Sequence, residues 1–230
     1  TSFLIVHRLS SLKWSFKRVR LLVAAPLVPA ALCLLSLPAA AQSSSPEALV
    51  RELSKGGLVV FMRHGDTGSA GADRQQAVIG DCSTQRNLND KGRAELVTMS
   101  AALKTLRVPV GKVLASDFCR GWQTADILFG AKAYTITSKL SVPASYPSVS
   151  QADTELNNTN LKAMLAEKPS AGSNTFLISH GVNVLLATSY HPNIQGEAVV
   201  FRPDGKGAYT RLGSILPDDW SRLAAGQGSK

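Results

Sequence analysis

The sequence has little of what metal sites and nucleic-acid-binding surfaces require. Only four of its 230 residues are histidine, and one of these lies within the first 41 residues. No two histidines have the H-x-x-x-H or H-E-x-x-H spacing, and the carboxylates are not clustered, so we expect no metal. Beyond residue 41, lysine and arginine are scattered without runs. This distribution argues against a nucleic-acid partner.

The first 41 residues lack acidic side chains altogether, although five of them are lysine or arginine. Within this segment an apolar stretch occupies residues 21–38, and Ala39 and Ala41 then form an A-x-A site. This order predicts a secretory signal peptide over residues 1–41, cleaved after Ala41. The alternative is a membrane anchor, because the apolar stretch is about long enough to span a bilayer. Pro26 and Pro29 within this stretch and the small residues that follow it favour cleavage.

Removal of the signal peptide would leave residues 42–230, enough for one well-buried domain. The formal charge would fall from +9 to +4, because the five basic residues would leave with it. We expect a periplasmic or secreted protein without stable membrane insertion. In such a protein the two remaining cysteines, Cys82 and Cys119, can form a disulfide. The alternative is two buried free thiols, and we favour the disulfide.

Short apolar runs alternate with helical patterns along residues 42–230. Runs rich in β-branched residues indicate buried strands, and apolar residues at helical spacing indicate helices. This alternation predicts a layered α/β/α domain with a mostly parallel central sheet. Residues 68–86 look like a long loop, which in a compact domain is usually functional. We expect strands at 58–62, 112–116, 133–141 and 174–179, helices at 46–55, 89–106, 119–130 and 159–169, a helical turn at 182–189, an irregular excursion at 141–158, and a closing hairpin over 196–217.

Polar side chains stand at the ends of three expected strands. Arg63 and His64 follow the first, Arg120 comes shortly after the second, and His180 follows the third. In open α/β sheets ligands bind beyond the carboxyl ends of the strands, so these groups should converge. Two guanidinium forks suit a dianionic phosphoryl group without a metal or other cofactor. One histidine can attack phosphorus, and the other can donate a hydrogen bond to the transferring oxygens.

Three short motifs then occur in order: "RHG" at 63–65, an S-x-x-x-R-x-x-x-T-A frame at 116–125, and "SHG" at 179–181. Together they resemble the histidine phosphatase superfamily, whose fold is that of phosphoglycerate mutase. The resemblance covers about residues 57–202. It implies that the histidine of "RHG" is the nucleophile that becomes phosphorylated.

By the same resemblance, Arg63, Arg120 and His180 form the phosphate pocket around the nucleophile His64. Thr67 is a further candidate, because its hydroxyl could bind phosphate or only stabilise the turn. Just ahead of the second helix, Arg86 and Asn87 could line the pocket mouth or cap that helix, and for these two we favour the structural role.

The family also needs a general acid that protonates the leaving oxygen. One branch has an aspartate directly after the second histidine, but Gly181 stands there in this sequence. Glu197 is our preferred candidate, because the stretch "GEAVVFRPDG" is similar to the matching region of small exported members. Those members include proteins resembling lipopolysaccharide heptose-phosphate phosphatases, and residues 81–93 resemble the same group. Glu155 and Asp153 are the alternatives.

Mutases of the superfamily carry the pattern "RHG-E-S-x-W-N", whose tryptophan and asparagine are missing here. We therefore expect an exported, metal-independent phosphomonoesterase rather than a mutase. Its partner would be a small phosphorylated substrate such as an envelope phospho-sugar. The alternatives are a phosphohistidine or phosphoprotein phosphatase of the same superfamily, and a non-catalytic relative that only binds anions.

Overall fold

The computed structural model describes residues 43–227 except 69–72, 74–76 and 145. All described residues belong to one compact unit, Ala39–Lys230. The predicted signal peptide lies outside the described residues and remains a prediction. Within the described part of the chain, no helix combines the length and the apolar character needed to cross a membrane.

A six-stranded sheet with the order β3-β2-β4-β1-β5-β6 forms the centre of the unit. Strands β1 to β4 are parallel to one another, whereas β5 runs antiparallel to β1 and β6 antiparallel to β5. This arrangement confirms the predicted mostly parallel sheet and the closing hairpin. The strands are β1 (Val59–Arg63), β2 (Val110–Ser116), β3 (Thr135–Thr137), β4 (Asn174–Ser179), β5 (Ala198–Pro203) and β6 (Tyr209–Ile215).

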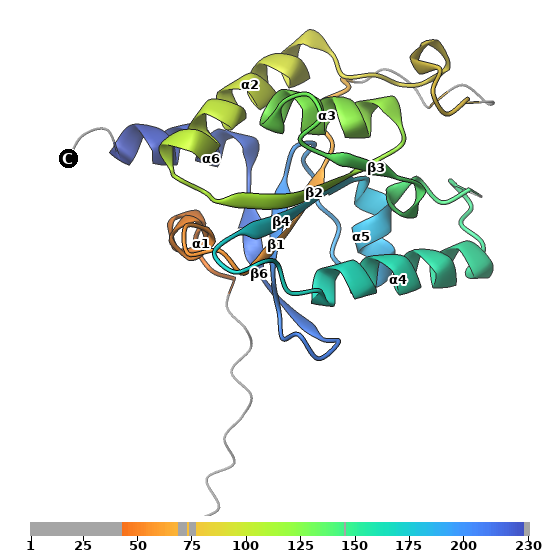
Figure 1. Ribbon diagram of the computed structural model, residues 1–230. Helices are drawn as coiled ribbons and strands as arrows, with labels where there is room; N and C mark the ends of the chain where they lie inside the picture. Colours follow the sequence, from red (N-terminus) through yellow and green to blue (C-terminus); the bar gives the residue numbers. More distant parts are fainter. Residues whose placement is uncertain (1–42, 69–72, 74–76, 145, 228–230) are drawn as a thin grey trace, which may run out of the picture. The chain divides into compact units, whose positions relative to one another are not determined.

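Helices cover both faces of this sheet, which confirms the three-layered α/β/α architecture (Figure 1). Side chains alternate along β1: Val60 and Met62 pack into one core cluster, and Val59 and Phe61 into the other. Both faces of the strand are therefore buried, as its unbroken apolar sequence indicates. The first cluster includes α1 (Pro46–Leu53), α2 (Asp90–Thr105), α3 (Cys119–Phe129) and α6 (Pro217–Gln227), and the second α4 (Gln151–Ala166) and α5 (Gly181–Thr188).

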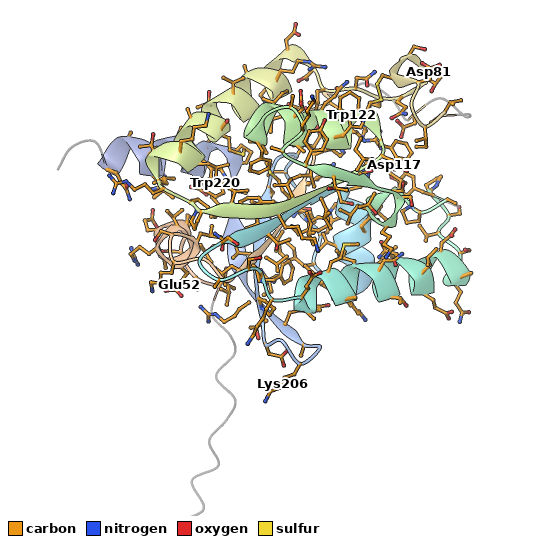
Figure 2. The ribbon with its side chains drawn as sticks, in the orientation of Figure 1. Glu52, Asp81, Asp117, Trp122, Lys206 and Trp220 are labelled. Carbon is orange, nitrogen blue, oxygen red and sulfur yellow. A yellow bond between two sulfur atoms is a disulfide. The ribbon has the colours of Figure 1, made fainter. Side chains whose placement is uncertain are left out.

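Three local predictions need correction. Helix α4 begins at Gln151, not at residue 159, because the Ser150 side chain caps it by accepting a hydrogen bond from the Asp153 N–H at 3.1 Å. The third strand is shorter than expected, because the chain turns into a 3-10 helix, η2 (Ser138–Leu140), directly after β3. Helix α6 was not predicted at all, although it starts with proline and two aspartates and buries Trp220, labelled in Figure 2.

Candidate active site

The two histidines that follow β1 and β4 lie side by side, as the sequence predicts. These strands are parallel neighbours in a register that pairs Arg63 with Ser179. The backbone N–H of His64 donates to the Ser179 carbonyl at 2.9 Å, and the ring centroids of His64 and His180 are 5.3 Å apart. Both side chains are buried, with exposed fractions of 2% and 4%. The adjacent strand β2 ends at Ser116, whose Oγ lies 2.9 Å from His180 Nε2.

The hydrogen bond of His64 fixes its tautomer. Nδ1 lies 2.9 Å from the Gly65 carbonyl oxygen, which can only accept, so Nδ1 carries the proton. Burial, followed by the charge of Arg120, holds the pKa of His64 well below its usual range. The ring is therefore neutral near pH 7, and its Nε2 keeps a free lone pair. This is the state that a nucleophilic histidine needs.

The hydrogen bonds of Ser116 assign the same tautomer to His180. Ser116 Oγ accepts a hydrogen bond from the Phe118 N–H at 3.2 Å, so its own proton is available for His180 Nε2. The proton of the neutral ring then sits on Nδ1, which is buried without a hydrogen-bond partner among the described residues. Burial, then Arg120 and His64, keep the pKa of His180 well below its usual range. His180 can therefore donate a neutral N–H to an anion beside His64.

The two predicted phosphate-binding arginines are anchored differently. Arg120, in the first turn of α3, is 3% exposed and donates from Nη1 and Nη2 to the two carboxylate oxygens of Asp73, at 2.8 and 3.1 Å. Arg63 donates from Nη1 to the carbonyls of Pro192 and Asn193, at 3.0 and 3.2 Å. The Nε atoms of both arginines are buried and have no partner within the described ranges. Each guanidinium thus keeps a donor for a ligand oxygen.

Asp73 was not singled out from the sequence, although the loop that contains it was expected to be functional. Its carboxylate engages Arg120 through two parallel hydrogen bonds, as two oxygens of a phosphate would. One of its oxygens also accepts the backbone N–H of Arg86 at 2.8 Å. Any anion that binds to Arg120 must therefore compete with this carboxylate.

Thr67 is buried, and its described hydrogen bonds run to another part of the chain. Its backbone N–H and its hydroxyl both donate to Gln195 Oε1, at 2.5 and 3.3 Å. These contacts join the turn after His64 to the segment before β5. They support the turn-stabilising role, and phosphate binding by Thr67 remains a prediction.

Glu197 precedes β5 and is 3% exposed. Its Oε1 accepts a hydrogen bond from the Tyr190 hydroxyl at 2.5 Å, and its Oε2 a long one from the Ile194 N–H at 3.4 Å. Burial is the main reason that the pKa of Arg63 is lowered, and the negative charge of Glu197 opposes that shift. Of the alternatives, Glu155 is exposed on α4 and accepts from Gln151 at 2.8 Å, and Asp153 lies in the first turn of α4.

The disulfide between Cys82 and Cys119 is present, as predicted. It joins the short 3-10 helix η1 (Cys82–Thr84) to the first residue of α3, one position before Arg120. The described residues contain no group of three or more His, Cys, Asp or Glu arranged to hold a metal ion.

Comparison with known proteins yields a family match and several similar folds. The family model described as histidine phosphatase superfamily (branch 1) matches residues 59–140, from β1 to η2. An Escherichia coli K-12 protein described as an alpha-ribazole-5'-P phosphatase has a TM-score of 0.54 at 14% identity, over 70% of this chain and 98% of that chain. A mycobacterial protein described as hydrolase 1 has a TM-score of 0.50 at 13% identity, over 69% and 99%. The protein histidine phosphatase SixA complexed with tungstate has a TM-score of 0.48 at 22% identity, over 70% and 98%.

No curated protein sequence matches the chain. The two similarities with TM-scores of 0.50 and 0.54 are below 25% identity and establish the fold alone. The family match adds sequence evidence to the shared fold, because residues 59–140 include both the "RHG" motif and the second arginine, Arg120. The segment from β1 to η2 is therefore similar to the histidine phosphatase superfamily.

Proposed function

We propose that this protein hydrolyses phosphate monoesters in two in-line steps through a phosphohistidine on His64. The observation that carries this proposal is the tautomer of His64, because its Nδ1–H is bound to a carbonyl and its Nε2 is left as the nucleophile. In the first step Nε2 bonds to phosphorus, the ester P–O bond breaks, and the leaving oxygen takes a proton. In the second step water attacks the phosphohistidine, which releases inorganic phosphate and restores His64.

The proposed role of Arg63, Arg120 and His180 is to stabilise the charge on the non-bridging phosphoryl oxygens. Phosphoryl transfer depends mainly on positioning and charge stabilisation, and preorganised donors in a buried site are the most effective means of providing both. The Nε atoms of the two arginines and Nδ1 of His180 support this role, because none of them has a hydrogen-bond partner among the described residues. The charge carried by the arginines is also why we propose that no metal is required.

We propose Glu197 as the acid that protonates the leaving oxygen, with Glu155 and Asp153 as the alternatives. Its burial and its electrostatic interaction with Arg63 support this choice. The Tyr190 hydroxyl donates a hydrogen bond to its Oε1 and so holds the carboxylate in place.

We further propose that the protein is exported to the periplasm or beyond and that it acts on a small phosphorylated molecule such as an envelope phospho-sugar. The predicted signal peptide supports export. The disulfide is consistent with it, because such bonds persist mainly in oxidising compartments.

The first test is hydrolysis of p-nitrophenyl phosphate by the purified protein without added metal and with a chelator. The wild type should turn over, and His64→Ala should reduce the rate to background. Glu197→Gln should slow hydrolysis of an alkyl phosphate more than that of p-nitrophenyl phosphate, whose leaving group needs little protonation. Trials with a phosphohistidine peptide and a sugar phosphate would separate the candidate substrate classes. An inert wild type that is nevertheless stabilised by tungstate would instead indicate a non-catalytic anion-binding protein.

A further inference from the structure

Arg86 belongs to a segment that is fixed to the first turn of α3. The disulfide joins Cys82 to Cys119, and Gln85 Oε1 accepts the Cys119 N–H at 2.8 Å. Asn87 closes the segment on itself, because its side-chain NH₂ donates to the carbonyls of Cys82 and Gln85, at 2.7 and 3.0 Å. The residues on both sides of Arg86 are thus tied down beside the helix turn that carries Arg120.

The backbone of Arg86 takes part in the pocket itself. Its N–H donates to Asp73 at 2.8 Å, and its carbonyl accepts a long hydrogen bond of 3.4 Å from Arg120 Nη1. The side chain is different, because its Nε is buried and has no hydrogen-bond partner in the described part of the chain. The described hydrogen bonds of Arg86 all involve its backbone.

The charge of Arg86 acts on all four predicted pocket residues. Burial is the main cause of the lowered pKa of His64 and of His180, and the positive charge of Arg86 adds to it in both. For Arg63, Arg86 is the next cause of the lowered pKa after burial, and it also lowers the pKa of Arg120. The backbone contacts of Arg86 with Asp73 and Arg120 place the residue beside the pocket, and these electrostatic interactions agree with that position.

A structural role does not account for this side chain. The cap of α2 is Asn89, whose Oδ1 accepts the Gly92 N–H at 2.7 Å, so neither Arg86 nor Asn87 is needed there. A cation held near two other arginines raises the energy of the protein unless an anion compensates it. Asp73 already shares its carboxylate between Arg120 and the Arg86 backbone.

We propose that Arg86 is a third phosphate-binding arginine, which contacts the phosphoryl group together with Arg63 and Arg120, and that the Cys82–Cys119 disulfide positions it. The inference rests on the proposed function for its catalytic consequence, but anion binding tests it independently. Arg86 would act on the same non-bridging oxygens, so it should affect both the binding of a tetrahedral oxyanion and the rate of transfer.

The test compares Arg86→Met and Arg86→Lys with the control Arg93→Met. Arg93 is exposed on α2 and donates to Gln123 at 3.1 Å, so its removal also deletes one charge but leaves the pocket intact. Calorimetry with tungstate should show affinity about 10- to 100-fold weaker for Arg86→Met, the usual effect of losing a hydrogen bond to a charged group. Arg86→Lys should recover part of the loss, and kcat/KM for p-nitrophenyl phosphate should fall in parallel.

Equal tungstate affinity in Arg86→Met and Arg93→Met would overturn the inference. That outcome is distinguishable from failure of the proposed function, which would appear as absent turnover in the wild type. Circular dichroism and thermal unfolding of each variant establish that the fold is intact.

The positioning role of the disulfide needs its own readout. Removal of the disulfide by the double variant Cys82→Ser/Cys119→Ser should weaken tungstate binding when Arg86 is present. In the Arg86→Met background the same removal should have much less effect, because the disulfide acts on the ligand only through Arg86. Asn87→Ala should behave in the same way and leaves the disulfide intact, so it covers the case in which the serine variant does not fold. Equal losses in both backgrounds would refute the positioning role.

Discussion

Replacing Asp73 by asparagine should make the pocket bind oxyanions more tightly. The wild-type carboxylate occupies the Arg120 fork through hydrogen bonds of 2.8 and 3.1 Å, and a ligand must displace it. A hydrogen bond to a charged group contributes about 1.5–3 kcal/mol net. Asp73 is 24% exposed, so solvent screening reduces this contribution, and we take about 1–2 kcal/mol for the contact as a whole.

The apparent dissociation constant rises in inverse proportion to the fraction of molecules whose fork is free. At 1.4 kcal/mol for each factor of ten, tungstate should bind Asp73→Asn about 5- to 30-fold more tightly. Calorimetry measures this directly. Asp90→Asn is the control, because Asp90 is exposed in the first turn of α2 and its removal deletes the same charge outside the pocket.

Unchanged or weaker binding by Asp73→Asn would refute this reasoning, since a competing carboxylate can only lower affinity for an anion. A loss of turnover confined to poor leaving groups would have a different meaning. It would identify Asp73, not Glu197, as the source of the proton for the leaving oxygen.

Three further predictions concern pH, packing and the disulfide. The folded protein lowers the pKa of His64 and His180, so below about pH 6.5 the unfolded chain binds more protons than the folded protein. As the pH decreases through this range, the free energy of unfolding should fall by up to about 1.4 kcal/mol per pH unit for each histidine. Urea titrations between pH 8 and 5 measure this slope, and a flat profile would contradict it. Gly121→Ala would bring a Cβ to 2.8 Å from the Ser116 Cβ, so we expect the free energy of unfolding to fall by about 1–3 kcal/mol. Because Ser116 contacts His180, the variant should also turn over more slowly. Wild-type kinetics would argue against this connection between Gly121 and His180. The disulfide joins residues 37 positions apart, so the double serine variant should be less stable by about 4 kcal/mol in denaturant titrations. An unchanged midpoint of unfolding would show that the disulfide does not constrain the unfolded chain.

The convergence of the two arginines and the two histidines could be predicted from the sequence, because each stands at the end of a strand or shortly after it. A short apolar run, a polar residue at its end and a parallel neighbour are all local features, and the sheet brings their ends together. Arg86 and Asp73 could not be found in this way. Their positions depend on a disulfide, an amide contact to α3 and a bidentate ion pair, which join segments that are distant in sequence and carry no periodic pattern.

The start of α4 was missed for a related reason. Over residues 151–158 only Asn157 is buried, so the first two turns of this helix show no apolar periodicity that would distinguish them from a loop. The signal that does exist is the Ser150 cap, a single side chain that precedes the helix. Helices that begin on an exposed surface are recognised by their caps rather than by their cores.

The ion pair between Asp73 and Arg120 also bears on how the product leaves. Inorganic phosphate presents the same oxygens as the phosphoryl group of a substrate, so a pocket of three arginines would retain it after hydrolysis. Departure of a tightly held product often limits the turnover of an enzyme. A carboxylate that reclaims the Arg120 fork as soon as phosphate loosens would prevent rebinding. The contact that weakens substrate binding would then also shorten the time for which each molecule is blocked by its own product.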